Sequence, residues 1–573
     1  MAGRAVESGL VEALSGVLAR RLSDRNAHIA AVDLAGQVKL GEFRAYVEGV
    51  THTSPDPELL GRVADALAGE PEIDSATPVQ SKVHFSPSTQ LLVDVVARCA
   101  GLEAADEAPV DRPGVIVTFC SPNTNKPLHL GHLRASLLGM SIAELVEASG
   151  TPVLRSQMLS NFGIHICQAL AIWERDPVDP ASVGTKGDWF VGELYRRYHE
   201  EASDDEGVQA RCAERDCPHC RAAEMLRAMV AGDETLLEAN ARLTGWVIDG
   251  MAATHARIGT RYDVEFLELD TLPLAFDAIR EATAAGLCRR RDDGSTFIEV
   301  DEKRGAEVTL LRGDGTPLVF TQFLGVHLGR GDRYPGWRIF ELTGEQWRSG
   351  RAAMYEVLRR LDRPDLAERM DNVWFGMVQL GGATMRSRTG TGVLTDSLLD
   401  DVRDRVAAWR DRPALLDVDD ADVDALAVAL VKYYMLGFSR QSPIDFDDDV
   451  LWSTATEGLG RVASALAWAD APVEAGSGDE SGAASRALAL LLAREGATAD
   501  RALYKQDPAI LVRYLDELSD AAHAAARGPE LGAPLRAAFG RVTRRTLRLL
   551  NIDLPAARRG AASLVGTARS RPA

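Results

Sequence analysis

Residues 115–134 read VIVTFCSPNTNKPLHLGHLR, and this stretch decides the fold class of the chain. Val115–Phe119 is a short apolar run, which is typical of a buried strand. After a loop with two prolines, a helix is predicted over residues 131–149, with Gly150 at its C-cap. A second apolar run, Val153–Gln157, completes the order strand, loop, helix, strand. This order predicts a Rossmann-type, doubly wound α/β domain with a parallel sheet.

The turn between the strand and the helix places His129, Gly131 and His132 at a helix N-terminus. Free backbone amides and the helix dipole favour a phosphate there. Gly131 has no Cβ, so a ribose or a base can approach the backbone closely. The two imidazoles can donate to an α-phosphate on which charge develops during attack by a carboxylate. A lone His-x-Gly-His also arises by chance, and two turn histidines without a function are the alternative.

The longer pattern Ser-Pro-Asn-x-x-Lys-Pro-Leu-His-Leu-Gly-His-Leu-Arg starts at Ser121 and ends at Arg134. It resembles the signature of the arginyl-tRNA synthetases, a family of class I aminoacyl-tRNA synthetases. The resemblance implies a ligase that activates an amino acid with ATP and Mg²⁺, releases pyrophosphate and transfers the acyl group to tRNA. It assigns catalysis to Lys126, His129 and His132, and nucleotide contacts to Leu130 and Gly131.

A second segment, Trp374–Leu380 followed by Met385–Gly390, resembles the family's second signature loop, which closes over the triphosphate. Guanidinium groups there neutralise phosphate charge. The usual Lys-Met-Ser-Lys-Ser form is absent, and Lys126 stands where a lysine often substitutes in this family. On its own, the loop reads equally as a polar connector. The resemblance implies nucleotide contacts at Met377, Val378 and Ser387, and catalytic roles for Arg386 and Arg388.

The amino-acid pocket departs from the family, whose members hold the substrate guanidinium with carboxylates and a tyrosine. Thr118 stands at one carboxylate position, and an ungapped match puts Val319 and Phe323 at the tyrosine and the second carboxylate. A guanidinium needs paired carboxylates and is costly to bury without them. We therefore expect an uncharged, apolar amino acid. The alternatives are a misaligned helix, or replacement of the missing groups by Glu341 or Glu345.

Four other residues are substrate-binding candidates by resemblance. Asn123 and Gln346, which address the backbone groups of the amino acid in the family, are retained. The family's Asp-Trp-Gly-x-Gln becomes Asn161-Phe-Gly-Ile-His165. The alternative for His165 is a satisfied core residue.

The length of 573 residues predicts about three domains. Residues 1–110 are predicted to form an α+β domain resembling the family's extra N-terminal domain, which contacts the tRNA elbow. Residues 111–400 are predicted to form the catalytic domain, with a helical insertion at about 185–260. Residues 401–573 are predicted to form an all-α bundle resembling the anticodon-binding domain. The expected N-terminal helices cover 5–22, 57–68 and 89–101, and the expected strands 45–49, 79–85, 296–300, 307–311 and 338–342. The expected C-terminal helices cover 421–436, 458–468, 485–495, 508–526 and 533–550.

The net charge of −20 disfavours a broad basic face for nucleic acid, so tRNA must meet local patches. The C-terminal arginines 541, 544, 545, 548, 558, 559, 569 and 571 are candidates, or else a solvated surface. Seven scattered cysteines suit a reducing cytoplasm. Cys212, Cys217, His219 and Cys220 are either free thiols and a histidine or a zinc site. No apolar run is long enough for a membrane span and no secretory signal is seen, so we expect a cytoplasmic protein. We also expect a monomer.

Three functions stay open from the sequence. The first is an arginyl-tRNA synthetase homologue with an altered pocket. The second is a biosynthetic relative that acylates a small amine without tRNA, as in peptidyl-nucleoside antibiotic pathways. It is favoured by the pocket and by Thr454–Val462, which replaces a family stretch of Glu-Gly-Asn-Thr type. The third is a non-catalytic tRNA-binding relative.

Overall fold

The computed structural model describes residues 38–41, 44–48, 61, 64–65, 68–79, 82–99, 113–202, 217–301, 306–381, 383–384, 393–409, 418–472, 482–527 and 532–555. The chain divides into two compact units. The first comprises residues 109–408 and 434–451. The second combines residues 1–108 with 409–433 and 452–573.

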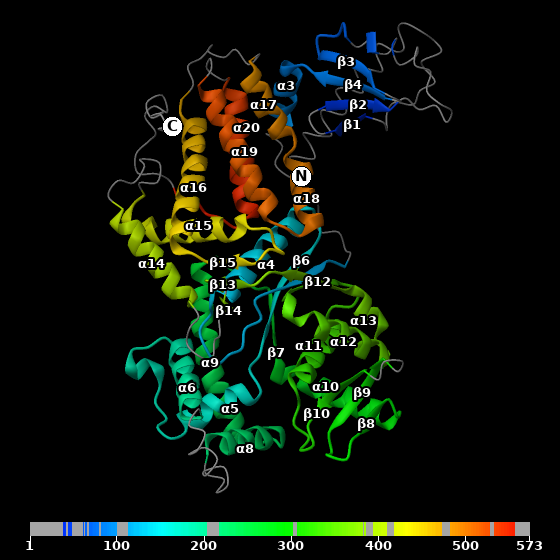
Figure 1. The fold of residues 1–573 in the computed structure, drawn as a ribbon, viewed down its shortest axis with the longest axis vertical. Coiled ribbons are helices and arrows are strands. Elements are labelled where there is room, and N and C mark those ends of the chain that lie inside the picture. The colour runs from blue at the N-terminus through cyan, green and yellow to red at the C-terminus, as the bar shows by residue number, and fades with distance from the viewer. Residues whose placement is uncertain are drawn as a thin grey trace. The chain divides into compact units, whose positions relative to one another are not determined.

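A five-stranded parallel sheet in the order β12-β11-β5-β6-β7 forms the centre of the first unit (Figure 1). From β5 the chain extends to β6 and β7 on one side and later to β11 and β12 on the other. The order therefore reverses between β5 and β11, as in doubly wound folds, and the predicted fold class is confirmed. The strands are β5 (Val115–Thr118), β6 (Val153–Leu159), β7 (Val264–Leu267), β11 (Arg338–Gly344) and β12 (Met370–Phe375).

Helix α4 (Leu130–Ala148) connects β5 to β6 and buries most of its residues. It ends where Gly150 takes a left-handed conformation with φ 78°, which glycine adopts at little cost. Further helices pack on the apolar face around Ile116 and Ile339. They are α10 (Glu268–Ala284), α11 (Val319–Arg333), α12 (Arg348–Arg360) and α13 (Pro364–Arg369).

Between β6 and β7 the chain inserts a helical subregion with a core of its own around Leu170, Val191, Met225 and Val247. Its helices are α5 (Ile164–Trp173), η2 (Pro180–Val183), α6 (Gly187–Ala202), α8 (Pro218–Val230) and α9 (Glu234–Arg257).

Two small sheets complete the first unit. Strands β8 (Cys288–Arg290), β9 (Thr296–Asp301) and β10 (Ala306–Leu311) form an antiparallel sheet, which contains two of the predicted strands. Strands β13 (Val378–Leu380), β14 (Ala383–Thr384) and β15 (Ile444–Asp445) form the other. The 3₁₀ turn η3 (Glu345–Trp347) follows β11, and α14 (Thr395–Ala408) follows residue 394.

The second unit joins an N-terminal antiparallel sheet, in the order β1-β2-β4-β3, to a helical bundle. Helix α3 (Thr89–Cys99) packs its apolar face, including Leu92 and Val96, against Leu488, Leu518 and Phe539 of the bundle. The strands are β1 (Val38–Gly41), β2 (Arg44–Glu48), β3 (Ile73–Val79) and β4 (Lys82–Pro87). The C-terminal helices are η5 (Asp420–Asp422), α15 (Val423–Gly437), α16 (Asp448–Asp470), α17 (Ala483–Ala493), α18 (Glu495–Lys505), α19 (Ala509–Ala526) and α20 (Ala533–Leu549).

One predicted element is wrong. The single β-run over residues 79–85 is two antiparallel strands, β3 and β4, in which Val79 pairs with Lys82. The alternation continues from one strand into the next, so the sequence pattern does not show that the chain reverses its direction. The helix predicted over 5–22 and most of that over 57–68 lie outside the described residues. No helix in the described part of the chain is both long and apolar enough to cross a membrane.

Candidate active site

The carboxyl ends of β5, β6 and β11 lie at one edge of the parallel sheet, beside the point where the strand order reverses. Ligands of doubly wound sheets bind in the crevice outside this edge. β5 ends at Thr118, and Asn123 forms a further parallel bridge with Ser160 just beyond β6. Thr124 donates to the Ser160 carbonyl from its backbone N at 3.1 Å and from Oγ1 at 2.9 Å. The segment Ser121–Arg134, called the signature segment below, thus begins as an extension of the sheet.

The chain leaves β5 through a strained bend. Cys120 and Ser121 have φ angles of 65° and 48°, in the left-handed region that favours glycine. Each such residue costs about 1–2 kcal/mol. The Ser121 Oγ accepts a hydrogen bond from the Met158 backbone N at 3.2 Å, which holds the bend against β6.

Residues 129–132, the histidine turn, start α4 with an interlocked cap. The His129 Nδ1 accepts from the Gly131 backbone N at 3.1 Å, and the His132 Nδ1 accepts from the His129 backbone N at 3.4 Å. The two rings stack with centroids 3.9 Å apart. A Cβ on Gly131 would meet the His129 ring at 3.0–3.1 Å, so this position leaves little room for a side chain.

Both histidines of the turn are neutral at pH 7. Burial and then the charge of Lys126 lower the pKa of His129 to about 4. Burial, His129 and Lys126 lower the pKa of His132 well below its usual value. Because a backbone N–H can only donate, each Nδ1 is an acceptor, and the proton of each neutral ring is on Nε2. The turn therefore presents two uncharged N–H donors and, from Lys126, one nearby positive charge.

The predicted nucleotide residues Met377 and Val378 are fixed to the same helix. Arg134 of α4 donates from Nη2 to the carbonyl oxygens of Ser439, Arg440 and Ser442 at 3.0, 3.1 and 2.8 Å. The Arg440 carbonyl accepts from the Gly376 N at 2.9 Å, and the Ile444 N donates to the Met377 carbonyl at 2.9 Å. Arg134 is fully buried. Its guanidinium thus connects α4, which the histidine turn starts, to the segment that contains Met377 and Val378, the first residue of β13.

The predicted phosphate-binding residues Arg386, Ser387 and Arg388 lie outside the described residues. The segment that follows them is fixed beside the histidine turn. The Leu130 N donates to the Val393 carbonyl at 3.3 Å, and the Thr395 N donates to the Leu128 carbonyl at 2.9 Å. The exit of the second signature loop therefore pairs with the backbone on both sides of His129.

A buried charge cluster, formed by His327, Arg330, Glu341 and Arg351, lies under the predicted amino-acid pocket. Glu341, beside Thr118 in the sheet, faces the Arg351 Nη1 at 3.0 Å and the Arg330 Nη2 at 3.5 Å. Arg330 also donates to the Thr118 Oγ1 at 2.6 Å. Burial raises the pKa of Glu341, but Arg351, His327 and Arg330 outweigh it and hold the value at about 2.

The cluster carries a surplus positive charge. Burial lowers the pKa of His327 to about 3, although Glu341 opposes this shift, so the ring is neutral. Its Nδ1 and Nε2 lie 2.7 Å from Arg330 and 2.9 Å from Arg351. Two guanidinium groups then face a single carboxylate. The alternative that Glu341 replaces the family's missing carboxylates is not favoured, because both of its oxygens already face guanidinium groups.

The remaining pocket candidates are spread around this edge. Val319 begins α11 and is 46% exposed. The centre of the Phe323 ring lies 5.7 Å from the centre of the Trp347 ring and 5.4 Å from the Arg351 Cζ. Gln346 is exposed, and its side chain covers Gly344 so closely that a Cβ there would meet its Oε1 at 2.4 Å. Asn123 is exposed at the bridge to Ser160.

Asn161 and His165 lie at the end of β6. The buried Asn161 Oδ1 accepts from the Leu269 N at 3.0 Å, a contact that positions α10. The His165 Nε2 lies 3.4 Å from the Ser160 Oγ, which donates to Glu268 at 2.7 Å. Burial is the main cause that lowers the pKa of His165 to about 4, and it raises the pKa of Glu268 to about 8. Both side chains are therefore uncharged near neutral pH.

Sequence reasoning missed the guanidinium groups of the cluster. Arg330 and His327 stand three residues apart on α11, and Glu341 interrupts the apolar strand Arg338–Leu342. The sequence did contain one signal of this cluster, because charged residues occupy positions that the apolar pattern predicts to be buried. The partner Arg351 comes from α12, and no local pattern connects it to the others.

The possible zinc site is only partly described. Cys212 lies outside the described residues. Cys217 caps α8, where its Sγ accepts from the Cys220 N at 3.3 Å, and the His219 Nδ1 lies 2.6 Å from the Tyr198 hydroxyl. Among the residues that the structure describes, no His, Cys, Asp and Glu side chains group to hold a metal.

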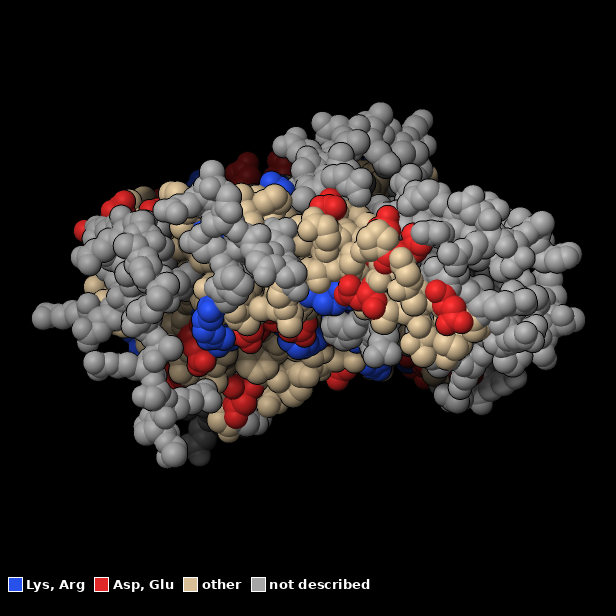
Figure 2. All heavy atoms as spheres, turned by 90° about the horizontal axis from the view of Figure 1, so that it is seen from above, with Lys and Arg blue, Asp and Glu red and all other residues tan. Residues whose placement is uncertain are grey.

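The C-terminal arginines are partly neutralised. Arg544 pairs with Asp470 at 2.5 Å and Arg545 with Glu495 at 3.3 Å, whereas Arg541 and Arg548 are exposed. Arginines 558, 559, 569 and 571 lie outside the described residues. On the face drawn in Figure 2, the described basic and acidic side chains are interspersed, without a broad basic field. An RNA contact would therefore depend on local patches.

Comparisons with known proteins agree with this geometry. Residues 101–447 match the family described as "tRNA synthetases class I (R), catalytic domain". The chain is 32% identical over 354 residues to the arginine–tRNA ligase of Porphyromonas gingivalis, a match that spans 59% of each chain. It is 29% identical over 433 residues to that of Treponema denticola, across 71% of each chain. The fold is similar to that of the Thermus thermophilus arginyl-tRNA synthetase, with a TM-score of 0.67, 20% identity and coverage of 95% of this chain and 99% of that one.

Proposed function

Since the chain belongs to the arginyl-tRNA synthetase family of class I, we propose that it activates an uncharged amino acid with ATP. The adenylate would form at the histidine turn, and the acyl group would then pass to an acceptor. The proposed adenylation rests on one observation, the two neutral Nε2–H groups of this turn.

The adenylation step needs donors where charge develops on the α-phosphate. A carboxylate oxygen of the amino acid attacks the α-phosphorus, the bond to the pyrophosphate oxygen breaks, and pyrophosphate leaves. His129 and His132 donate to the equatorial oxygens, and the first amides of α4 add their dipoles. Lys126 supplies positive charge, Arg386 and Arg388 neutralise the β- and γ-phosphates, and Mg²⁺ accompanies the triphosphate. Leu130, Gly131, Met377, Val378 and Ser387 hold the nucleotide.

The buried charge cluster supports an uncharged substrate. A guanidinium entering beside Thr118 would approach Arg330 and Arg351, and the only carboxylate of the cluster already faces both. Like charges in a buried site disfavour binding strongly. Val319 and Phe323 then give the pocket aliphatic and aromatic surfaces, while the buried Thr118 would act on the substrate site through the hydrogen bond that its Oγ1 accepts from Arg330. Asn123, Asn161, His165 and Gln346 would complete the substrate contacts.

ATP–pyrophosphate exchange with each amino acid, with and without total tRNA, tests this function. We expect exchange with an apolar or other uncharged amino acid and none with arginine. Arginine-only exchange that requires tRNA would contradict the altered pocket. A complete lack of exchange would favour the third candidate, a non-catalytic tRNA-binding relative, which the intact histidine turn disfavours.

The acceptor is tRNA in the first candidate and a small amine in the second, which would place the chain in an antibiotic-type pathway. A pocket that rejects arginine removes the reason to recognise arginine tRNA, and this favours the second candidate. Thr454–Val462 lies within the continuous helix α16, in place of the family's stretch. If tRNA is the acceptor, residues 1–110 would contact its elbow and residues 401–573 its anticodon, and residues 111–400 would form the catalytic domain. A cytoplasmic monomer fits either acceptor.

A further inference from the structure

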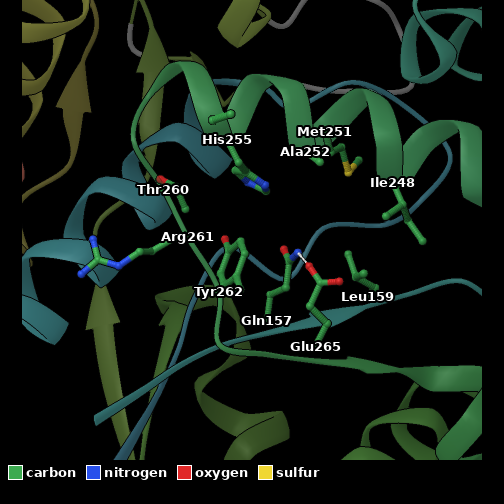
Figure 3. A pocket seen from close by; sticks show the side chains of 11 residues that line it. Gln157, Leu159, Ile248, Met251, Ala252, His255, Thr260, Arg261, Tyr262 and Glu265 are labelled. Carbon is green, nitrogen blue, oxygen red and sulfur yellow. Dashed lines mark hydrogen bonds between the residues drawn. The ribbon is translucent and has the colours of Figure 1, made fainter.

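A cavity of about 220 Å³ lies between α9 and the strands β6 and β7 (Figure 3). It is smaller than typical ligand pockets of about 300–1,000 Å³, so it fits a small molecule. Leu159, Ile248, Met251 and Ala252 give it an apolar wall. None of these residues belongs to the nucleotide or amino-acid sites described above.

Polar groups face this wall. Gln157 and Glu265 are direct partners between β6 and β7, and the Gln157 amide donates to the Glu265 carboxylate (Figure 3). Gln157 and Thr260 are 3% and 6% exposed, and the Gln157 Oε1 and Thr260 Oγ1 have no hydrogen-bond partner among the described residues. A buried acceptor without a donor is unfavourable, so a ligand that brings N–H or O–H groups would be stabilised here.

Two of the residues that line the cavity are charged, Arg261 and Glu265. Arg261 is neutralised by ion pairs with Glu144 and Glu147, which lie outside the lining. This leaves the exposed Glu265 carboxylate to attract a cation to the cavity.

The inner wall of the cavity is adjacent to the signature segment. The His255 Nε2 lies 3.7 Å from the Sγ of Cys120, the residue before Ser121. The Tyr262 ring lies 5.2 Å from that of His255 and 5.0 Å from that of Phe119 at the end of β5. A ligand in the cavity would therefore be separated from the strained bend by single side chains.

We propose that this cavity binds a small primary amine with an apolar body, and that this amine is the acyl acceptor. The ammonium group would meet Glu265 and donate to the Gln157 Oε1, while the body packs against Met251 and Ala252. The inference rests on the proposed activation of an amino acid, because an acceptor needs an adenylate to react with.

The acyl group is then transferred from the adenylate to the amine. The ammonium loses one proton to solvent, and the nitrogen of the free amine attacks the carbonyl carbon of the aminoacyl adenylate. As the amide forms, this nitrogen loses a second proton to solvent. A C–N bond forms, the C–O bond to the phosphate breaks, and AMP leaves with that electron pair. The products are an amide and AMP, and no oxidant or reductant takes part.

Benzylamine is the test ligand, with benzyl alcohol as its neutral counterpart. Ala252→Phe fills the apolar side of the cavity from the exposed face of α9. Ala253→Phe is the matched control, because Ala253 is also exposed on α9 but does not line the cavity. Calorimetry on the full chain should show benzylamine binding that weakens at least tenfold in Ala252→Phe and in Glu265→Gln but not in Ala253→Phe. Benzyl alcohol should bind more weakly than benzylamine and be insensitive to Glu265→Gln.

Amide formation is then followed by mass spectrometry with the amino acid found by exchange. We expect a benzylamide that Ala252→Phe reduces while amine-free pyrophosphate exchange continues. The proposal would be overturned if benzylamine did not bind, or if it bound equally well to all variants. It would also be overturned if tRNA were the only acceptor that is acylated and Ala252→Phe impaired that acylation. Exchange with no amino acid would refute the proposed activation instead, and amine binding would still report on the cavity.

Discussion

The histidine turn and the buried charge cluster lie at the same edge of one sheet, yet they are built in different ways. The turn is a local structure, in which four consecutive residues form their own cap through hydrogen bonds from backbone N–H groups to the two imidazole rings. The cluster draws its side chains from α11, β11 and α12. The turn depends on neighbouring residues alone, whereas the cluster depends on how three separate elements pack. A substitution in one element can therefore change the charge balance of the cluster without changing the turn.

Glu341→Gln breaks the cluster side of this comparison, and we expect the largest effect from it. Removal of the carboxylate leaves two buried guanidinium groups without a counter-charge, which should lower the free energy of unfolding by about 3–5 kcal/mol. Urea unfolding measures it. Glu345→Gln is the matched control, because Glu345 is exposed and pairs with Arg348 at the surface, where such a pair contributes about 1 kcal/mol or less. Equal losses in the two variants would show that Glu341 does not balance the cluster.

His132→Ala breaks the turn side. Loss of one fixed donor should lower the rate of pyrophosphate exchange by about 10²–10³-fold. The stability of the fold should change much less than in Glu341→Gln. His219→Ala, at an exposed position of α8, serves as the control and should retain exchange. Exchange that persists in His132→Ala would remove the turn from the mechanism.

His165, in the first turn of α5 after β6, sharpens the comparison through pH. Its pKa of about 4 in the folded chain lies below the ordinary value of 6.5. At pH values between 4 and 6.5, the unfolded chain binds a proton at His165 more readily than the folded chain does. The contribution of neutral His165 to the free energy of unfolding is therefore fully present above pH 6.5 and decreases as the pH falls toward 4. When the pH falls from 6.5 to 5.5, the free energy of unfolding of the native chain should decrease by up to about 1.4 kcal/mol more than that of His165→Gln. Unfolding curves at both pH values measure this, and parallel losses would contradict a neutral His165.

The sequence was informative where structure is local. Val115–Phe119, α4 and β6 follow from apolar periodicity and a glycine stop, and the histidine turn follows from adjacent residues. It failed to separate β3 from β4, because alternation alone cannot show that the chain reverses its direction. It could not assemble Arg351 with Arg330 and Glu341, because their contacts depend on how separate elements pack. The same holds for the cavity, whose Gln157 and His255 are 98 residues apart in the chain.

In the proposed mechanism, the neutral state of His129 and His132 would also affect turnover. Charged imidazoles would retain the phosphate of AMP by ion pairing after acyl transfer. Uncharged N–H donors would hold that phosphate through their dipoles only, and most firmly while extra negative charge develops on it. The cap that sets both tautomers, with the proton of each ring on Nε2, would thus favour release of AMP as well as formation of the adenylate.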